Sequence, residues 1–304
     1  MTRRCSPRGL TRIDVVTAVF LGCLLILLVP VLFARPREQS MRRLCAANLA
    51  RIGKAMLIYA GDYEDELPRA GGRNTVWGAT AKWAAFDRRA AFGLAADGSG
   101  GAASITASFY LLVKYCEMPT RLFVCKADKG TTEFKLSERL DVPVSFELDD
   151  AWDFGDTTEN YRHCSYTYHI PYGLYNLSTS NDPNLAVAAD RTPWIKGPAT
   201  DPGVFAAFKP DTGATGGVGT SDQACMGNSM THQRDGQNVL FLDGRVSFEK
   251  RAYCAVDKDN IYTVSRNRIE GDPLGVQPVP ASRLSPMNRK DSLLVHDPDT
   301  FSGG

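Results

Sequence analysis

The sequence contains little that would mark an enzyme or a nucleic-acid-binding protein. Its charges nearly cancel, with 35 Lys and Arg against 34 Asp and Glu, and no block of like charge occurs. Such balance gives no electrostatic footprint for nucleic acid, so we expect no nucleic-acid partner. The chain has no Gly-x-Ser-x-Gly, His-Glu-x-x-His or phosphate-loop motif, which are the usual signatures of hydrolases, metalloproteases and nucleotide-binding enzymes.

Histidine is also scarce, and no arrangement of it matches a familiar metal site. The four histidines are His163, His169, His232 and His296. His163 and His169 are six residues apart with Cys164 between them, and Cys-x-x-Cys is absent, so the usual zinc spacings are missing. We therefore expect a protein that is not an enzyme and has no cofactor.

Long apolar runs are missing except for one, from Ile13 to Phe33, whose single charge is Asp14. About 20 apolar residues in a helix span the hydrocarbon core of a bilayer, so the sequence predicts a transmembrane segment at 10–34 after a basic leader at 1–9. Three interpretations compete: a cleaved secretory signal, a plain signal anchor, and a leader removed by a dedicated peptidase. The run is longer than the roughly 7–15 apolar residues of a secretory signal.

The junction Gly9-Leu10-Thr11-Arg12-Ile13-Asp14 resembles the processing site of type IV prepilins and type II secretion pseudopilins. The resemblance implies cleavage after Gly9 by a prepilin peptidase and N-methylation of Leu10. It also gives Asp14 a role, because the fifth residue of the mature chain in that family is a carboxylate that guides assembly. A carboxylate buried in lipid needs a partner, which the new N-terminal ammonium would supply.

Residues 35–68 predict an amphipathic continuation of the same helix, ending near Gly61-Asp62 before Pro68. Apolar side chains recur at steps of mostly three and four, at Met41, Leu44, Cys45, Leu49, Ile52, Met56 and Tyr59. A pilin-like family abundant in planctomycete-type bacteria has a similar helix, matched here by Cys45-Ala46-Ala47-Asn48-Leu49, Ile52-Gly53, Ala55-Met56 and Tyr59.

Residues 238–248 contain two apolar segments separated by Asp243-Gly244, a strong signal for a β-hairpin with a type I′ turn. With His232 upstream, this segment resembles the His…Asp-Gly processing-associated domain that closes the same pilin-like family. The stretches 189–194 and 259–263 resemble that group as well. A lone His before a hairpin favours a structural hydrogen-bonding role, and the Asp243 side chain is expected to serve the turn.

Six cysteines follow the apolar run, and an even number in an exported body favours disulfides. Cys116 and Cys125 are the most local candidate pair, with buried free thiols as the alternative. Three acidic clusters, at 62–66, 149–156 and 257–259, offer oxygen ligands for Ca²⁺. None has EF-hand spacing, so solvated acidic loops are the favoured interpretation and a bound Ca²⁺ is the alternative.

The predicted fold is α+β: a long N-terminal transmembrane and amphipathic helix packed on an antiparallel sheet, with large loop insertions in a body at 69–304. The family resemblance implies a non-enzymatic pseudopilin-like subunit of a pilus-like or type II secretion-associated fibre. Its expected partners are prepilin peptidase, copies of itself or other pilin-like subunits, and the bacterial inner membrane, with the body in the periplasm or on an extracellular fibre. The alternative is a membrane-tethered periplasmic binding module or hydrolase, whose exposed aromatics could line a sugar site: Trp77, Trp83, Trp152 and Trp194.

Overall fold

The computed structural model describes residues 12–212, 221–280 and 284–301, and between 25 and 36 it describes the backbone only. The chain divides into two units, residues 1–41 and 42–304, and each is treated by itself. Helix α1 (Arg12–Asp62) contributes its first part to one unit and its last part to the other. The predicted leader at 1–9, with Gly9, and the predicted first mature residue Leu10 lie outside the described residues.

The first unit is helical from Arg12, and its described large apolar side chains are exposed. Among the residues that the structure describes, no helix is both long enough and apolar enough to cross a membrane. The side chains described in the apolar run end at residue 24, short of the roughly 20 apolar residues that a span requires. This finding corrects the predicted transmembrane segment at 10–34, the transmembrane part of the predicted fold, and the single-pass position in the inner membrane.

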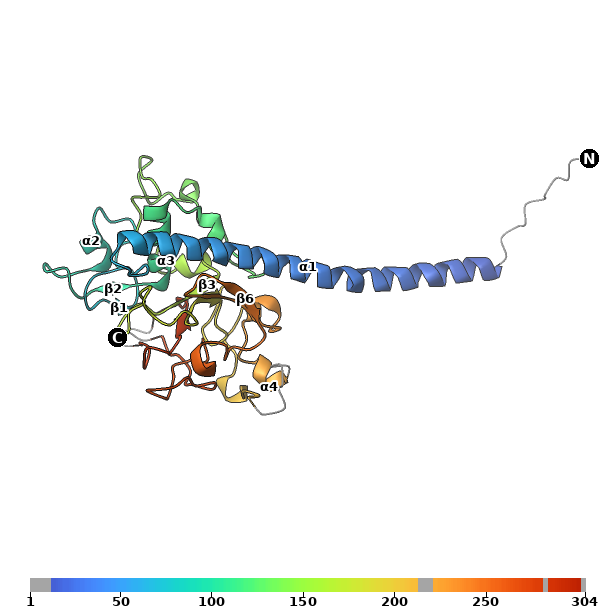
Figure 1. Ribbon diagram of the computed structural model, residues 1–304. Coiled ribbons are helices and arrows are strands. Elements are labelled where there is room, and N and C mark those ends of the chain that lie inside the picture. Colours follow the sequence, from blue (N-terminus) through green and yellow to red (C-terminus); the bar gives the residue numbers. More distant parts are fainter. Residues whose placement is uncertain (1–11, 213–220, 281–283, 302–304) are drawn as a thin grey trace, which may run out of the picture. The chain divides into compact units, whose positions relative to one another are not determined.

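The second unit is built around a five-stranded antiparallel sheet with strand order β6-β5-β4-β3-β7. Two of its strands, β3 and β6, are labelled in Figure 1. Its strands are β3 (Tyr166–His169), β4 (Ala186–Asp190), β5 (Gln237–Phe241), β6 (Val246–Glu249) and β7 (Leu294–Val295). The hairpin predicted at 238–248 is confirmed by β5 and β6. The antiparallel sheet of the predicted α+β fold is therefore present.

Both faces of the central strands are buried. The strands therefore do not alternate between apolar and polar residues, and most of the polar side chains that they do contain are hydrogen-bonded. In β5, Leu240 belongs to the core beneath the helices, while Val239 and Phe241 belong to a second core on the opposite face. In β4 the register slips between Ala186 and Ala188. This β-bulge turns both Val187 and Ala188 toward the helical side.

The C-terminal part of α1 covers one face of the sheet. Gly53 allows the close approach, because a Cβ at that position would lie 2.7 Å from a Leu240 methyl group. The helix ends at Asp62, as predicted from Gly61-Asp62. Its buried side chains are Cys45, Leu49, Ile52, Ala55, Met56, Tyr59 and Ala60.

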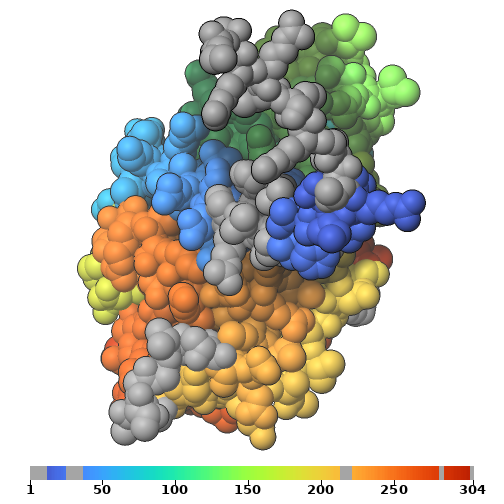
Figure 2. All heavy atoms as spheres, turned by 90° about the vertical axis from the view of Figure 1, so that its right-hand side faces the viewer, coloured from blue at the N-terminus to red at the C-terminus, as the bar shows by residue number. Residues whose placement is uncertain are grey.

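Helix α3 (Ile105–Cys116) packs on the same face, with the rings of Phe109 and Tyr168 5.1 Å apart. The remaining short elements are β1 (Val76–Trp77), β2 (Ala102–Ala103), α2 (Arg88–Phe92) and α4 (Asp222–Cys225). Strands β1 and β2 pair in parallel as a separate two-stranded sheet. In Figure 2 the lighter blue of α1 lies against the orange of the β5–β6 hairpin, in agreement with the 2.6 Å ion pair between Arg42 and Asp235.

The turn of the hairpin differs from the predicted type I′. Gly244 has φ of +85°, whereas Asp243 has no positive φ. The Gly244 N–H donates to the Phe241 carbonyl at 2.9 Å, and the Phe241 N–H donates to the Arg245 carbonyl at 3.0 Å. These bonds make a three-residue loop with glycine in the left-handed position. The Asp243 carboxylate accepts a bond from the Arg245 N–H at 3.0 Å, which agrees with the turn role predicted for it.

Candidate functional site

The best-formed polar site is a buried cluster between α1 and the sheet, made by His232, Asp190 and Asn238. His232 Nε2 lies 3.4 Å from Asp190 Oδ2, and neither side chain is exposed to solvent. The same Asp190 oxygen accepts the backbone N–H of Asn238 at 2.7 Å and its Nδ2 at 3.2 Å. Asn238 Nδ2 also lies 3.3 Å from His232 Nε2. The three residues therefore form a closed polar triangle.

Local structure fixes each corner of this triangle. Asp190 is the last residue of β4, and Asn238 lies on the neighbouring strand β5, so their side chains point to the helical face. His232 ends a single 3₁₀ turn, Met230–His232, which is capped by the Ser229 hydroxyl. Gln233 follows with φ of +60°, which stops the turn and returns the chain to β5.

Burial is the largest influence on the Asp190 carboxyl and raises its pKa. The neighbouring His232 and the two hydrogen bonds from Asn238 act in the opposite direction. The second oxygen, Asp190 Oδ1, is buried with no hydrogen-bond partner among the described residues. Oδ2 of Asp190 is thus hydrogen-bonded to Asn238, whereas Oδ1 accepts no hydrogen bond from the described residues.

A disulfide joins Cys45 of α1 to Cys125 directly beside the triangle. The two sulfur atoms, His232 and an Asp190 oxygen all lie within 4.8 Å of one another, and all four residues are buried. The structure confirms the predicted presence of a disulfide but corrects the pair: Cys125 bonds to Cys45, and Cys116 keeps a free thiol. The Cys116 thiol contacts the Ala55 carbonyl of α1 at 3.7 Å.

The stretches around 189–194 and 259–263 converge on the same place. The Tyr262 hydroxyl donates to the Asp190 carbonyl at 2.8 Å, and the Thr167 hydroxyl lies 3.3 Å from the same carbonyl. Next along the chain, Arg191 forms a buried ion pair with Asp128, its Nε 2.8 Å from Oδ2. These contacts fix both the side chain and the backbone at the end of β4.

The cluster as it stands is a structural site, because a substrate cannot reach residues with no exposed surface. His232 has the hydrogen-bonding surroundings expected of it, but its carboxylate neighbour is Asp190. Asp243 and Gly244 lie in the hairpin turn, where Asp243 is partly exposed and paired with Arg245 at 2.7 Å. The residues of the His…Asp-Gly motif therefore lie in two separate places: His232 in the buried polar cluster, and Asp243 and Gly244 in the hairpin turn.

The predicted Ca²⁺ clusters are not brought together. Within 12–212, 221–280 and 284–301, the set of three or more metal-capable side chains in mutual reach is the one around the disulfide. Asp153 is buried and accepts bonds from Thr80 and Ser104, and Asp257 pairs with Lys290 at 2.6 Å. Burial, followed by the nearby Asp297, raises the pKa of Asp153 to about 6.

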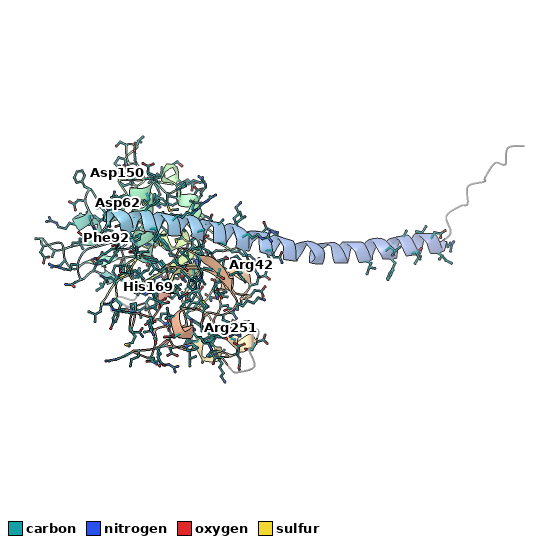
Figure 3. All side chains as sticks on the ribbon, in the orientation of Figure 1. Arg42, Asp62, Phe92, Asp150, His169 and Arg251 are labelled. Atoms are coloured by element: carbon teal, nitrogen blue, oxygen red, sulfur yellow. A yellow bond between two sulfur atoms is a disulfide. The ribbon has the colours of Figure 1, made fainter. Side chains whose placement is uncertain are left out.

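The tryptophans expected to line a sugar site, and also His169, lie inside the body. All four tryptophans are buried, with at most 7% of each exposed, which removes the proposed aromatic sugar site. His169 lies inside the body (Figure 3) and contacts the Asp291 carbonyl at 3.1 Å. Burial lowers its pKa to about 4, so it is neutral at physiological pH.

A separate cavity of about 370 Å³ lies beside the segment from Arg69 to Val76. Arg69 and Arg73 line it, and each has a carboxylate neighbour: Glu66 lies 3.1 Å from Arg69, and Asp97 lies 4.0 Å from Arg73. Its other polar lining residues include Asn74, Tyr172, Asn176 and Ser285.

Sequence analysis missed Cys45 as the disulfide partner and Asn238 as the link between His232 and Asp190. A signal for Cys45 was present, since it lies on the apolar face of the helix with Leu49 and Ile52 and was bound to meet the core. Comparison with protein-family models, curated proteins and solved structures gave no match.

Proposed function

We propose that the chain is a pilin-like structural subunit that assembles into a fibre through the N-terminal part of α1. The observation that supports this most is the contrast along one continuous helix of 51 residues. From Cys45 to Ala60 the helix buries one face against an antiparallel sheet. From Ile13 to Leu24 its large apolar side chains are exposed.

The exposed part needs a partner. Ile13 is 75% exposed, Val16 67% and Phe20 66%, and these residues do not form one narrow stripe. A helix that is apolar all round is stable when it is surrounded by other apolar surface. Equivalent helices of other copies would supply that surface.

Processing at the N-terminus would complete the mechanism. Removal of residues 1–9 by a prepilin peptidase frees an ammonium group at Leu10, four residues before Asp14. A carboxylate enclosed among apolar helices is stabilised by such a charge, so this pairing would favour subunits in the correct register. The proposed subunit is not an enzyme; its body is the surface that the fibre presents.

Mass spectrometry of the native chain tests processing, and crosslinking tests assembly. We expect a methylated N-terminus at Leu10 and ladders of crosslinked copies. Asp14→Ala should abolish the ladders while Asp14→Glu and the control Asp62→Ala, at the other end of α1, retain them. An intact Met1, or unchanged ladders in Asp14→Ala, contradicts the proposal.

The cavity beside Arg69 and Arg73 favours a second candidate, a module that binds a small anion. Two guanidinium groups among amide and hydroxyl groups suit a carboxylate or phosphate. Calorimetry with inorganic phosphate and with acetate, on wild type and Arg73→Gln, distinguishes this function. Heat of binding that is absent from Arg73→Gln supports it, and no heat with either probe excludes it for these anions.

A further inference from the structure

The surroundings of the Cys45–Cys125 disulfide contain more metal-binding chemistry than a structural disulfide needs. Two sulfur atoms, an imidazole nitrogen and a carboxylate oxygen lie within 4.8 Å of one another in a buried site. Two cysteines, a histidine and a carboxylate are all common zinc ligands. They come from four separate parts of the chain, so the fold itself assembles them.

We infer that, once the disulfide is reduced, Cys45, Cys125, His232 and Asp190 form a four-coordinate zinc site. The same two cysteines then form either of two crosslinks: a disulfide in the oxidised chain, or a bound metal ion in the reduced chain. One form joins α1 to the segment around Cys125 by a covalent bond. The other joins both to the end of β4 and to the turn before β5.

The distances suit a tetrahedral ion. Bonds of about 2.0–2.3 Å place neighbouring ligand atoms roughly 3.3–3.8 Å apart. The imidazole nitrogen of His232 and a carboxylate oxygen of Asp190 already lie within 4.8 Å of each other and of both sulfur atoms. The Cα atoms of the two cysteines are 5.4 Å apart, so their side chains can hold one ion between them after the S–S bond is broken.

The free oxygen of Asp190 is an independent indication of a ligand. Oδ1 is buried with no hydrogen-bond partner among the described residues, while Oδ2 is held by Asn238 at 2.7 Å. This is the arrangement of a metal-bound carboxylate, in which one oxygen binds the ion and a neighbouring donor orients the group. In the oxidised chain no other described group satisfies Oδ1.

The chemical balance is simple. A dithiol reductant gives two electrons and two protons to the S–S bond, yielding two thiols and the cyclic disulfide of the reductant. Zn²⁺ then displaces the two thiol protons and binds both thiolates, the neutral imidazole and the carboxylate. The closed site, with four protein ligands and no exposed surface, indicates a structural role for the ion.

The test uses the full chain, reduced with a dithiol in denaturant and refolded without oxygen in the presence of Co²⁺ or Zn²⁺. We expect one ion per chain and, with Co²⁺, a sulfur-to-cobalt charge-transfer band. The chain refolded with its disulfide intact should retain no metal. X-ray absorption of the zinc form should show two sulfur ligands at about 2.3 Å and two lighter ligands at about 2.0 Å.

Variants and a footprint separate this site from the other thiols. Cys116→Ser should bind as wild type does, whereas Cys45→Ser, His232→Gln and Asp190→Asn should bind at least about tenfold more weakly. If those variants do not fold, alkylation of the reduced wild type with and without metal remains decisive, because the metal should slow the alkylation of Cys45 and Cys125 and leave the rates at the other cysteines, buried Cys164 included, unchanged. Reduced protein that folds in the presence of the ion yet retains none, or metal-dependent protection of other cysteines, overturns the inference.

Discussion

The carboxylate of Asp297 accepts a hydrogen bond from the backbone N–H of Ile105 at 2.9 Å, across 192 residues of sequence. It also accepts the N–H of Thr106 at 2.8 Å and the indole N–H of Trp77 at 2.8 Å. Ser104 caps the same helix locally through the Ala107 N–H. The start of α3 is therefore satisfied partly by its own sequence and partly by a distant segment.

Replacing Asp297 by alanine should lower the free energy of unfolding by about 1–3 kcal/mol, because several buried donors lose their acceptor at once. Urea denaturation followed by circular dichroism measures the change. Asp299→Ala is the matched control, since Asp299 is partly exposed and pairs with Lys196 on the surface; such pairs contribute about 0–1 kcal/mol. Equal losses in the two variants would contradict the buried cap.

Asp291 should make the protein less stable as pH rises through the mildly acidic range. Burial raises its pKa to about 7, against the effect of hydrogen bonds from the N–H groups of Met287 and Ser265. The unfolded value is about 3.9, so the folded chain keeps a proton that the unfolded chain releases. The stability contributed by this group is full below about pH 4 and is lost as pH rises to about 7.

Asp291→Asn removes that dependence, so its free energy of unfolding relative to wild type should rise from about pH 4 to 7 and then stay constant. Denaturant titrations at a series of pH values give the difference directly. Exposed Asp201 provides the control, because Asp201→Asn should follow the wild type at every pH. A difference that is flat across the window would show that Asp291 is ionised throughout in the folded chain.

Loss of the Cys45–Cys125 disulfide should destabilise the metal-free protein by about 4 kcal/mol. The bond closes a loop with a sequence separation of 80 residues, and loops of that size restrict the unfolded chain strongly. We expect this loss for Cys45→Ser in combination with Cys125→Ser, and little change for Cys116→Ser. Peptide mapping without reductant should recover the linked peptides in Cys116→Ser; a Cys116–Cys125 link in wild type would refute the assignment.

The hairpin turn depends on glycine at position 244. Its φ of +85° is costly for other residues, although the space around a Cβ is open, with Leu57 3.8 Å away. Gly244→Ala should therefore lower the free energy of unfolding by about 1 kcal/mol through the backbone alone. Gly61 lies in the last turn of α1 and no atom lies near the position of its Cβ, so Gly61→Ala should instead raise the free energy of unfolding by about 0.5–1 kcal/mol. The midpoint temperature of thermal unfolding should therefore fall in Gly244→Ala and rise in Gly61→Ala.

Local signals in the sequence were sufficient to predict where several helices and strands lie. They were not sufficient to predict which segments pair or pack against one another. The end of α1 and the hairpin each follow from periodicity or turn residues within a short window. The type of turn at Asp243-Gly244 was predicted wrongly because a dipeptide does not specify the φ of both residues. The three-residue loop is selected by the register between β5 and β6.

The candidate site was only partly visible for a related reason. His232 and the stretch containing Asp190 were both noted, yet their contact depends on how β4 and β5 pair. Cysteine pairing is similar: Cys125 lies closer in sequence to Cys116, but the packing of α1 brings Cys45 to it. The transmembrane prediction relied on the length of one apolar run, and the described part of that run is too short to support it.

Strand β3 pairs on one side with β4, which follows it closely, and on the other with β7, which is synthesised more than a hundred residues later. During translation, the backbone groups on that second side of β3 have no partner until residues 294 and 295 emerge from the ribosome. Such an open strand can add to the strands of other nascent chains. The order of pairing therefore leaves one edge of β3 open to pairing with other chains until β7 docks.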